Sequence, residues 1–431
     1  MDKILAKPGH YTLTACLLVN QDTNNAIDLL GALSSFTISE SINQNSLQFK
    51  ADIHESISDA YGLLDGTEVL FCEWITPAYI KEQTARRHVF RVTNIGGLFF
   101  EVGTQRYEYT IAGIDELAYD QEFNNISTAY SDSITSIVDK VYKHALDNPI
   151  ELISEPDSYK LNTDDTEGVV DLIIPNESPF KAIEYLRGYT YSSKYPSSQY
   201  LFFQNSEGYN FRNMESLITE GKEKLSDAKT KTALTYVYAP SQQMTKISDT
   251  ITMAYQAENL IQFNKHNMYS DSASGSLHSA VKEIDYMFKD MTVYEKKIDT
   301  KEYIGFDKKL DLNPKYMDTF NKEAGSTEYI YTDGFKTNRP NLPDAINQKK
   351  ISSALFYSNM IQITVPGNCE LTAGLLINLI VPSRIKKDKQ TEFENDENLS
   401  GVFIIKDIQH IFTQQMYSNI ITLVRSNYAG K

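Results

Sequence analysis

The spacing of apolar residues changes twice along this chain, and that change is the feature that most constrains its fold. Up to about residue 117 apolar and polar residues alternate, as in the run LQFKADI at 47–53, which is the pattern of a half-buried strand. Six such runs are separated by turn residues such as those at 65–66. We therefore expect residues 1–117 to form an antiparallel barrel or sandwich.

The spacing becomes helical after residue 118. Capping residue types at 131–133 precede apolar residues that recur every three or four positions, which predicts a helix ending before residue 149. A second helix is predicted to begin at Pro179, because proline suits the first helical turn. A hairpin is predicted over 200–211, with Gly208 supplying the positive φ of its turn. Residues 118–211 are thus expected to form an α/β middle domain.

The strand pattern returns at residue 361. Gly367 and Asn368 follow an alternating run as turn residues, and three further β-type runs close the chain. Gly374 is assigned to a turn position with positive φ, so Gly374→Val is expected to destabilise the protein. We expect residues 361–431 to complete a second barrel that begins within 212–360.

The segment 212–360 is the hardest to interpret. It is predicted to be a mixed region that holds part of the second barrel and an insertion, with strands over 231–238 and 251–263. Residues 351–360 fit either the end of a helix or a strand. Residues 270–276 are predicted to form a loop, and the charged run 384–400 a solvated hairpin tip. The sequence contains no internal repeat of fixed period. The predicted class is β-rich α+β, with two antiparallel barrel or sandwich modules around an α/β middle.

Charge and cysteine content exclude several classes of protein. The chain has 431 residues, of which 41 are Lys or Arg and 57 are Asp or Glu, so a general nucleic-acid binder is disfavoured. Residues 111–180 hold 3 basic and 15 acidic residues. They form either a solvated face or a surface that repels a polyanion. The three cysteines are too few and too widely spaced for a disulfide framework, which favours a reducing compartment.

Neither export nor membrane insertion is expected. The first eight residues contain two lysines and an aspartate and lack the apolar stretch of a signal peptide. The longest apolar run, residues 371–382, is too short to span a bilayer.

No constellation of catalytic residues is present. The sequence contains no zinc-protease, nucleophile-elbow or phosphate-loop motif, and its seven histidines lack metal-ligand spacing. The acidic loop around Asp164 and Asp165 is the best calcium candidate, but it lacks the ligand pattern of an EF-hand. Asp115 and Glu116 are adjacent carboxylates without the separation that glycosidases need. We predict no catalytic, cofactor or metal site, and a structural, assembly-forming protein.

Three groups of segments resemble the central hub protein of contractile phage tail baseplates, a family that includes the T-even hub and relatives in related injection machines. Their order along the chain carries the resemblance. They are residues 7–11, 38–49 and 65–69 near the start, 173–186 and 200–211 in the middle, and 367–374, 402–410 and 417–423 at the end. Within them, Pro179, Gly208, Gly367, Asn368 and Gly374 are turn and packing residues.

The resemblance implies a homotrimeric ring without enzymatic activity. In this family two barrels per subunit are similar to the tail-tube protein, so three subunits match a sixfold tube to a threefold spike. Implied partners are the tail tube protein, the trimeric spike and other baseplate or wedge proteins, and DNA would pass through the channel without specific binding. The protein would be a virion component assembled in the bacterial cytoplasm. The acidic segment 111–180 would line that channel or the outer rim.

Two alternatives remain open. The first is a receptor-binding or glycan-binding virion β protein, because 28 tyrosines and 20 phenylalanines can supply aromatic platforms as well as core packing. The second is a cell-wall-degrading tail enzyme.

Overall fold

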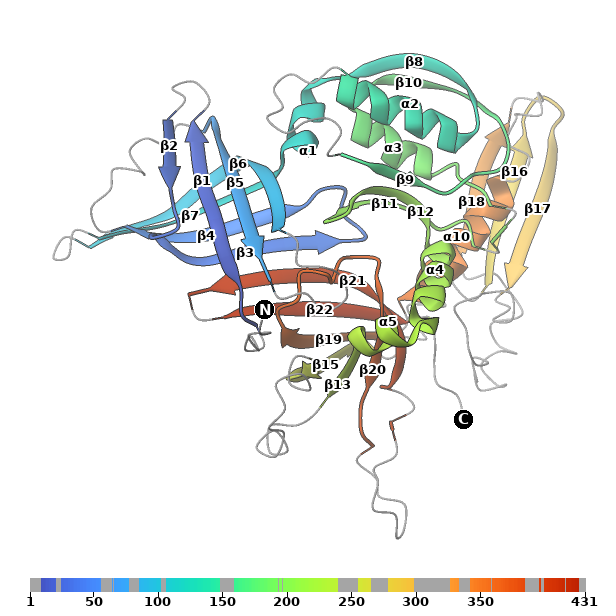
Figure 1. The fold of residues 1–431 in the computed structure, drawn as a ribbon. Helices are drawn as coiled ribbons and strands as arrows, with labels where there is room; N and C mark the ends of the chain where they lie inside the picture. Colours follow the sequence, from blue (N-terminus) through green and yellow to red (C-terminus); the bar gives the residue numbers. More distant parts are fainter. Residues whose placement is uncertain are drawn as a thin grey trace, which may run out of the picture.

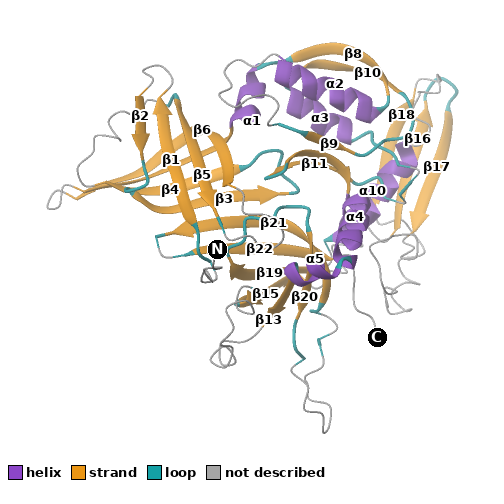
Figure 2. Ribbon diagram, in the orientation of Figure 1, coloured by secondary structure: helices purple, strands orange, loops and turns teal. Residues whose placement is uncertain are grey.

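The fold is β-rich, which confirms the predicted class. The computed structural model describes residues 9–20, 25–55, 64, 66–76, 85–101, 106–147, 159–192, 194–195, 197–238, 255–264, 278–297, 326–332, 342–357, 359–383, 395–396, 399–414 and 416–425. The predicted loop at 270–276 and most of the predicted hairpin tip at 384–400 lie outside these residues. Figures 1 and 2 show the arrangement of the described elements.

The first module is an antiparallel sheet made of one continuous stretch of sequence. Its strands are β1 (Thr12–Asn20), β2 (Asn25–Asp28), β3 (Leu33–Ser41), β4 (Gln48–Glu55), β5 (Glu68–Ile75), β6 (Ala85–Glu101) and β7 (Arg106–Asp115). Their order in space is β2-β1-β5-β6-β7-β4-β3. Burial alternates along β4 and β7, so the predicted period-two pattern corresponds to one face packed on the core.

The middle module combines helices with short strands (Figure 1). Its elements are α1 (Glu116–Asp120), η2 (Gln121–Phe123), β8 (Ile126–Asp132), α2 (Ile134–Asp147), β9 (Leu161–Thr163), β10 (Val170–Glu177), α3 (Pro179–Arg187), β11 (Tyr200–Asn205), β12 (Gly208–Asn213) and α4 (Met214–Ser226). The apolar faces of α2 and α3 share one core with Phe202 and Tyr209 from the hairpin β11–β12. Both predicted helices and the predicted hairpin are therefore present.

The second module is built from two distant stretches of sequence. Its strands are β13 (Thr235–Tyr238), β14 (Gln256–Ala257), β15 (Asn259–Asn264), β19 (Asn359–Pro366), β20 (Leu376–Ile380), β21 (Gly401–Thr413) and β22 (Tyr417–Arg425). Their spatial order is β14-β13-β20-β21-β22-β19-β15. If the seven strands of each module are numbered in the order in which they occur along the chain, both modules have the same spatial order of strands: second, first, fifth, sixth, seventh, fourth, third. The two modules therefore share a strand order that the sequence does not reveal as a repeat.

A separate, smaller sheet lies in sequence between the two stretches of the second module. It contains β16 (His278–Asp285), β17 (Asp290–Lys297) and β18 (Ser326–Thr332) in the order β17-β16-β18. Helix α10 (Leu342–Phe356) packs on one of its faces, with Asn347 accepting a hydrogen bond from Ser279 Oγ at 2.7 Å. The segment 351–360, undecided from sequence, is the end of this helix followed by the start of β19.

One sequence-based strand is corrected by the structure. Residues 231–233 belong to helix α5 (Ala228–Ala233), and the strand begins only at Thr235. The cause is local: Asp227 Oδ2 accepts a hydrogen bond from Thr230 N at 2.9 Å, which caps a short helix in front of the strand.

Candidate functional site

The junction of the first and second modules is formed by strand β21. Residues 401–404 of β21 pair with β20, and after a bulge at Lys406 residues 407–413 pair with residues 41–35 of β3. Strand β22 pairs along the other edge of β21 on both sides of the bulge. One strand thus belongs to both modules, and backbone hydrogen bonds make the fourteen strands a single sheet.

An aromatic cluster fills the junction. Phe412 stacks on Tyr417 with ring centroids 4.3 Å apart and contacts Trp74 at 5.4 Å and Phe36 at 5.9 Å. Burial raises the pKa of the Tyr417 phenol. Tyr417 N also donates to Gly9 O at 2.9 Å, so the chain leading into β1 is held by the end of the sequence. Two residues of the second module therefore complete the core of the first.

Buried polar groups lie beside this cluster. Glu40 and His410 are almost fully buried, with Glu40 Oε1 3.6 Å from His410 Nε2. Glu40 Oε2 accepts a hydrogen bond from Ala373 N at 2.9 Å, and His410 Nδ1 lies 2.6 Å from Tyr417 Oη. Nearby, burial lowers the pKa of His88 to about 4. These bonds fix β3, β21 and the turn before β20 relative to one another.

Gly367 and Asn368, predicted as turn residues, lie at this junction. A Cβ on Gly367 would be 2.0 Å from the Tyr417 ring, so only glycine fits. Asn368 is buried and pairs with Asn419: Asn419 Nδ2 donates to Asn368 O at 2.9 Å, and Asn368 N donates to Asn419 Oδ1 at 3.3 Å. The turn is therefore tied to strand β22.

Gly374 lies where the middle module meets the second. Its φ is +88°, and a Cβ there would be 3.1 Å from Phe203 Cζ of β11. Asn205 Nδ2 donates to Ala373 O at 3.0 Å, and Gly374 N donates to Ile405 O at 2.9 Å. This turn therefore contacts the middle-module hairpin on one side and β21 on the other.

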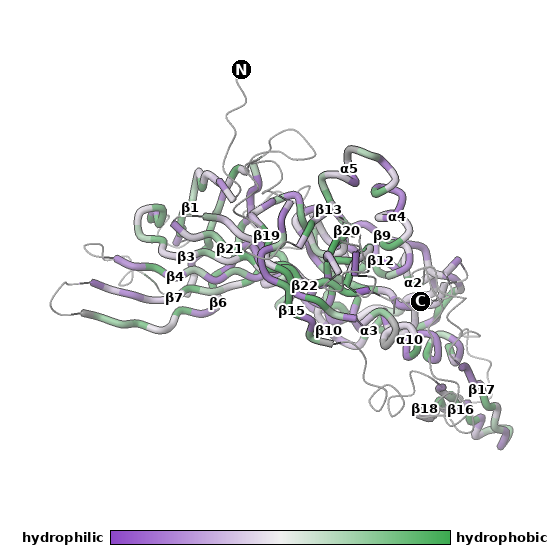
Figure 3. The backbone as a smooth tube through the Cα atoms, turned by 90° about the horizontal axis from the view of Figure 1, so that it is seen from below, coloured by the Kyte–Doolittle hydropathy of each residue, from purple (hydrophilic) through white to green (hydrophobic). Residues whose placement is uncertain are grey.

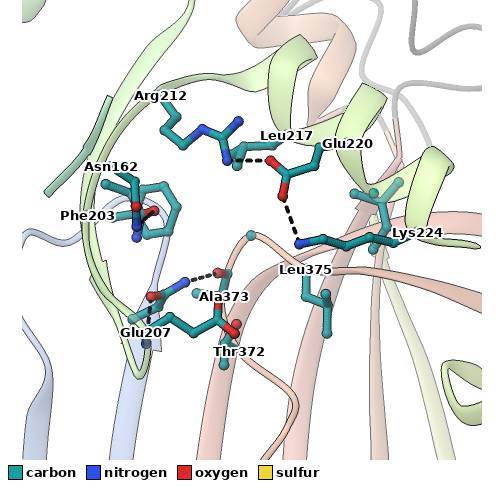
Figure 4. A pocket seen from close by; sticks show the side chains of 15 residues that line it. Asn162, Phe203, Glu207, Arg212, Leu217, Glu220, Lys224, Thr372, Ala373 and Leu375 are labelled. Carbon is teal, nitrogen blue, oxygen red and sulfur yellow. Dashed lines mark hydrogen bonds and ion pairs between the residues drawn. The ribbon is translucent and has the colours of Figure 1, made fainter. Parts of the chain in front are cut away.

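A polar cavity of about 160 Å³ opens beside the same turn (Figure 4). Arg212 Nη1 donates to Glu220 at 2.6 Å, and Lys224 lies 2.8 Å from the same carboxylate. Arg212 also pairs with Asp164, whose Oδ2 accepts a hydrogen bond from Asn213 N at 2.8 Å. In the loop that was the best calcium candidate, Asp164 therefore pairs with an arginine. Within the described ranges, no group of three or more His, Cys, Asp or Glu is arranged to hold a metal.

Pro179 and Gly208 lie in the middle module, away from the junction. Pro179 is the first residue of α3, and Phe180 N donates to Gln121 Oε1 at 2.9 Å. Gly208 has a φ of +129°, and a Cβ there would lie 2.7 Å from Lys160 O. These two residues therefore shape the middle module.

The adjacent carboxylates Asp115 and Glu116 mark the start of α1. Asp115 caps that helix through Leu117 N at 3.1 Å and accepts a hydrogen bond from Tyr209 Oη at 2.9 Å. Burial raises its pKa to about 6. Because its hydrogen bonds are to a helix cap and a core tyrosine, its observed role is structural.

Sequence reasoning did not identify Glu40, His410 or Tyr417, the buried polar and aromatic residues of the junction. The alternation in the closing strands places them on strands, but it does not indicate which strands meet. Among the described helices, none has the length and apolar character needed to cross a membrane. All three cysteines are buried and unpaired with one another.

The fold resembles that of a tail protein of known structure. No protein-family model and no curated protein matches the sequence. Among solved structures, the chain is similar to the tail protein from Neisseria meningitidis MC58, with a TM-score of 0.50, 10% identity and 96% of each chain covered.

Two further tail proteins match with lower TM-scores. The 43 kDa tail protein of prophage MuSo2 from Shewanella oneidensis gives a TM-score of 0.48 at 12% identity, over 96% of this chain and 98% of that one. A prophage tail protein from Listeria monocytogenes EGD-e gives 0.47 at 9% identity, over 97% and 96%. At such identities the likeness concerns the fold.

Proposed function

We propose that this chain is the structural hub of a contractile phage tail baseplate, in which three copies form a ring between a sixfold tail tube and a threefold spike. The observation that carries the proposal is the shared strand order of the two modules, which lie side by side in one sheet. Three such chains present six similar modules to a tube and three identical chains to a spike.

The junction supports a role for this ring in transmitting force. Ring assemblies that transmit force need modules that do not rotate against each other. Here a shared strand, a buried aromatic cluster and the hydrogen bond from Ala373 N to Glu40 connect the modules. This arrangement and the fold of the tail-protein neighbour support the proposal of a structural tail or baseplate role without enzymatic activity.

The proposed domain division keeps residues 1–117 as the first tube-like module and 118–211 as the middle domain. The second tube-like module takes strands from both 212–360 and 361–431, with the β16–β18 sheet as the insertion. The acidic segment 111–180 is proposed to face the channel, because acidic walls do not retain DNA.

The mass of the assembly tests the ring. Light scattering on the purified chain at increasing concentration is expected to approach three times 49.0 kDa. A cryo-electron map of the intact tail tip is expected to contain three copies between tube and spike. Six copies per tip, or a position on a side fibre, would refute the proposal.

A glycan-binding role is a second candidate, and the β16–β18 sheet favours it. Opposite the face covered by α10, Tyr329 and Tyr331 are exposed beside the hairpin tip, where Phe288 is exposed. Exposed aromatic rings stack on sugars. Binding of the isolated chain to purified host-surface glycan that is lost in Tyr331→Ala would establish this function. If the chain does not bind such glycan, the structural hub remains as the one proposed function.

A further inference from the structure

The second module contacts the first through β21, and the first module has an equivalent strand. Because the two modules share one strand order, β6 corresponds to β21, β7 to β22 and β3 to β15. The match extends to an irregularity. Strand β6 has a bulge at Thr93 where it pairs with β7, and β21 has a bulge at Lys406 where it pairs with β22. Strand β6 has a second irregularity between Gly96 and Phe99, which gives it one extra residue, so the two modules are aligned through the residues that lie opposite on β7 and β22.

The alignment places two aromatic pairs at equivalent positions. Phe412 and Tyr417 are opposite each other on β21 and β22, and Phe100 and Tyr107 are opposite each other on β6 and β7. Their ring centroids are 4.3 Å and 4.6 Å apart. The first pair is buried because β3 and the first module cover it, whereas Phe100 is exposed. The same feature is therefore covered in one module and uncovered in the other.

Among the described residues, the strand edge next to Phe100 has no partner strand either. Strand β5 pairs with β6 only as far as Arg91, and from Asn94 onward the described residues pair with β7 alone. In the second module the corresponding edge of β21 is occupied by β3. Figure 3 shows the ends of β6 and β7 extending away from the body of the molecule.

A matching open edge is present on β15, the counterpart of β3. Among the described strands β15 pairs with β19, and its other edge has no partner. Its outward residues are apolar: Ile261 is 51% exposed and Phe263 is also exposed. An unprotected apolar edge strand is a site for pairing with another chain.

We propose that the free edge of β6, residues 94–101, pairs antiparallel with the free edge of β15 from a second copy of this chain. The register follows from the junction within the chain. There Ile411 of β21 is opposite Thr37 of β3. In the alignment of the two modules, Phe99 of β6 is equivalent to Ile411 and Ile261 of β15 is equivalent to Thr37. We therefore expect Phe99 to lie opposite Ile261 of the second copy. Phe99 is 58% exposed, so pairing would bury two apolar side chains that water now contacts.

This contact is head to tail, since it joins different surfaces of the two copies, and a head-to-tail contact closes into a ring when its rotation permits. Each copy would then contain one β21–β3 junction inside the chain and one β6–β15 junction with its neighbour. The inference rests on the proposed ring and specifies which strands form it.

Cysteine cross-linking tests the register in the full-length protein. Phe99→Cys and Ile261→Cys are made as separate single variants, each in the otherwise native chain, whose own cysteines are buried. After mild oxidation the mixture of the two variants is expected to give disulfide-linked dimers, and either variant alone is expected to give far fewer. The double variant is expected to give linked trimers. Phe99→Cys mixed with Val293→Cys is the control, because Val293 is similarly apolar and exposed on β17.

The outcomes separate the inference from the proposed function. Equal cross-linking with Val293→Cys, or none at concentrations where light scattering shows a trimer, would overturn the β6–β15 contact and leave the hub intact. No cross-linking together with a monomeric mass at all concentrations would also overturn it. Specific cross-linking in a ring of six chains would keep the contact and refute the trimeric hub.

Discussion

The two β-modules have the same strand order but reach it by different routes. The first comes from one stretch of about a hundred residues, whereas the second is interrupted between β15 and β19 by a separate sheet and a helix. Strand β13 runs parallel to its neighbours, while its counterpart β1 is antiparallel to both of its own. The order of strands in space is thus retained although chain direction and connection length differ.

A second difference concerns how each module completes its core. The core of the first module includes Phe412 and Tyr417, which the second module supplies. The core of the second module draws instead on residues of the middle module, such as Leu201 and Phe203. The first module therefore depends on the C-terminal hairpin of the second.

The largest expected effect is that of Tyr417→Ala. The side chain is fully buried and stacks on Phe412, so its removal is expected to lower the free energy of unfolding by about 4 kcal/mol. Denaturant titration measures the loss, and hydrogen exchange should show reduced protection in the first module as well as in β21 and β22.

Tyr107→Ala is the matched control for that prediction. Tyr107 occupies the equivalent position in the first module, but it is only half-buried in the single chain. Its removal is expected to cost about 1 kcal/mol. Equal losses for the two tyrosines would contradict the view that one pair is covered and the other open.

The second prediction uses pH. His88 stacks on Trp74, and burial lowers its pKa to about 4; Glu40 opposes that shift, whereas Arg86 and His410 add to it. The unfolded chain binds this proton near pH 6.5 and the folded chain near pH 4, so stability falls as pH decreases through this window. The loss is expected to reach at most about 3 kcal/mol at pH 4.

The control for the pH prediction is His88→Phe, which keeps the stack on Trp74 and removes the proton. The position equivalent to His88 in the second module is Gly401, so hydrogen exchange at pH 4.5 is expected to show the first module opening before β19–β22. If the variant and the native chain lose stability in parallel between pH 6.5 and 4, His88 does not cause the loss.

The sequence predicted individual elements well and their partners poorly. Alternation at 47–53 predicted β4, and helical spacing predicted α2, because burial of one face is a local property of the residue pattern. Alternation does not specify which strand lies alongside. The pairing of β21 with β3 joins residues more than 360 positions apart, and no local pattern encodes it.

The candidate site shows the same limit. Gly367, Asn368 and Gly374 were identified because turn residues have a local signature. Glu40 and His410 were not, because isolated polar residues in a strand are usually solvent-exposed, and only the meeting of β3 with β21 buries them. The repeated topology was invisible for a related reason: the equivalent positions carry different residues, such as Thr93 and Lys406.

The smallest expected effects come from two equivalent turns. Gly66 has a φ of +95° and lies two residues before β5, and Gly374 has a φ of +88° and lies two residues before the equivalent strand β20. Alanine at either position strains the backbone by about 1 kcal/mol. A Cβ at position 66 meets nothing within 4 Å, whereas at position 374 it lies 3.1 Å from Phe203.

Gly374→Ala is therefore expected to cost about 2 kcal/mol and Gly66→Ala about 1 kcal/mol, because only the first adds crowding to backbone strain. Thermal unfolding of the two variants measures the difference, and the double variant Gly374→Ala with Phe203→Leu should recover part of the larger loss relative to Phe203→Leu alone. A loss at Gly66 as large as that at Gly374 would show that strain alone sets both costs, and that the contact between the middle and second modules contributes nothing at this turn.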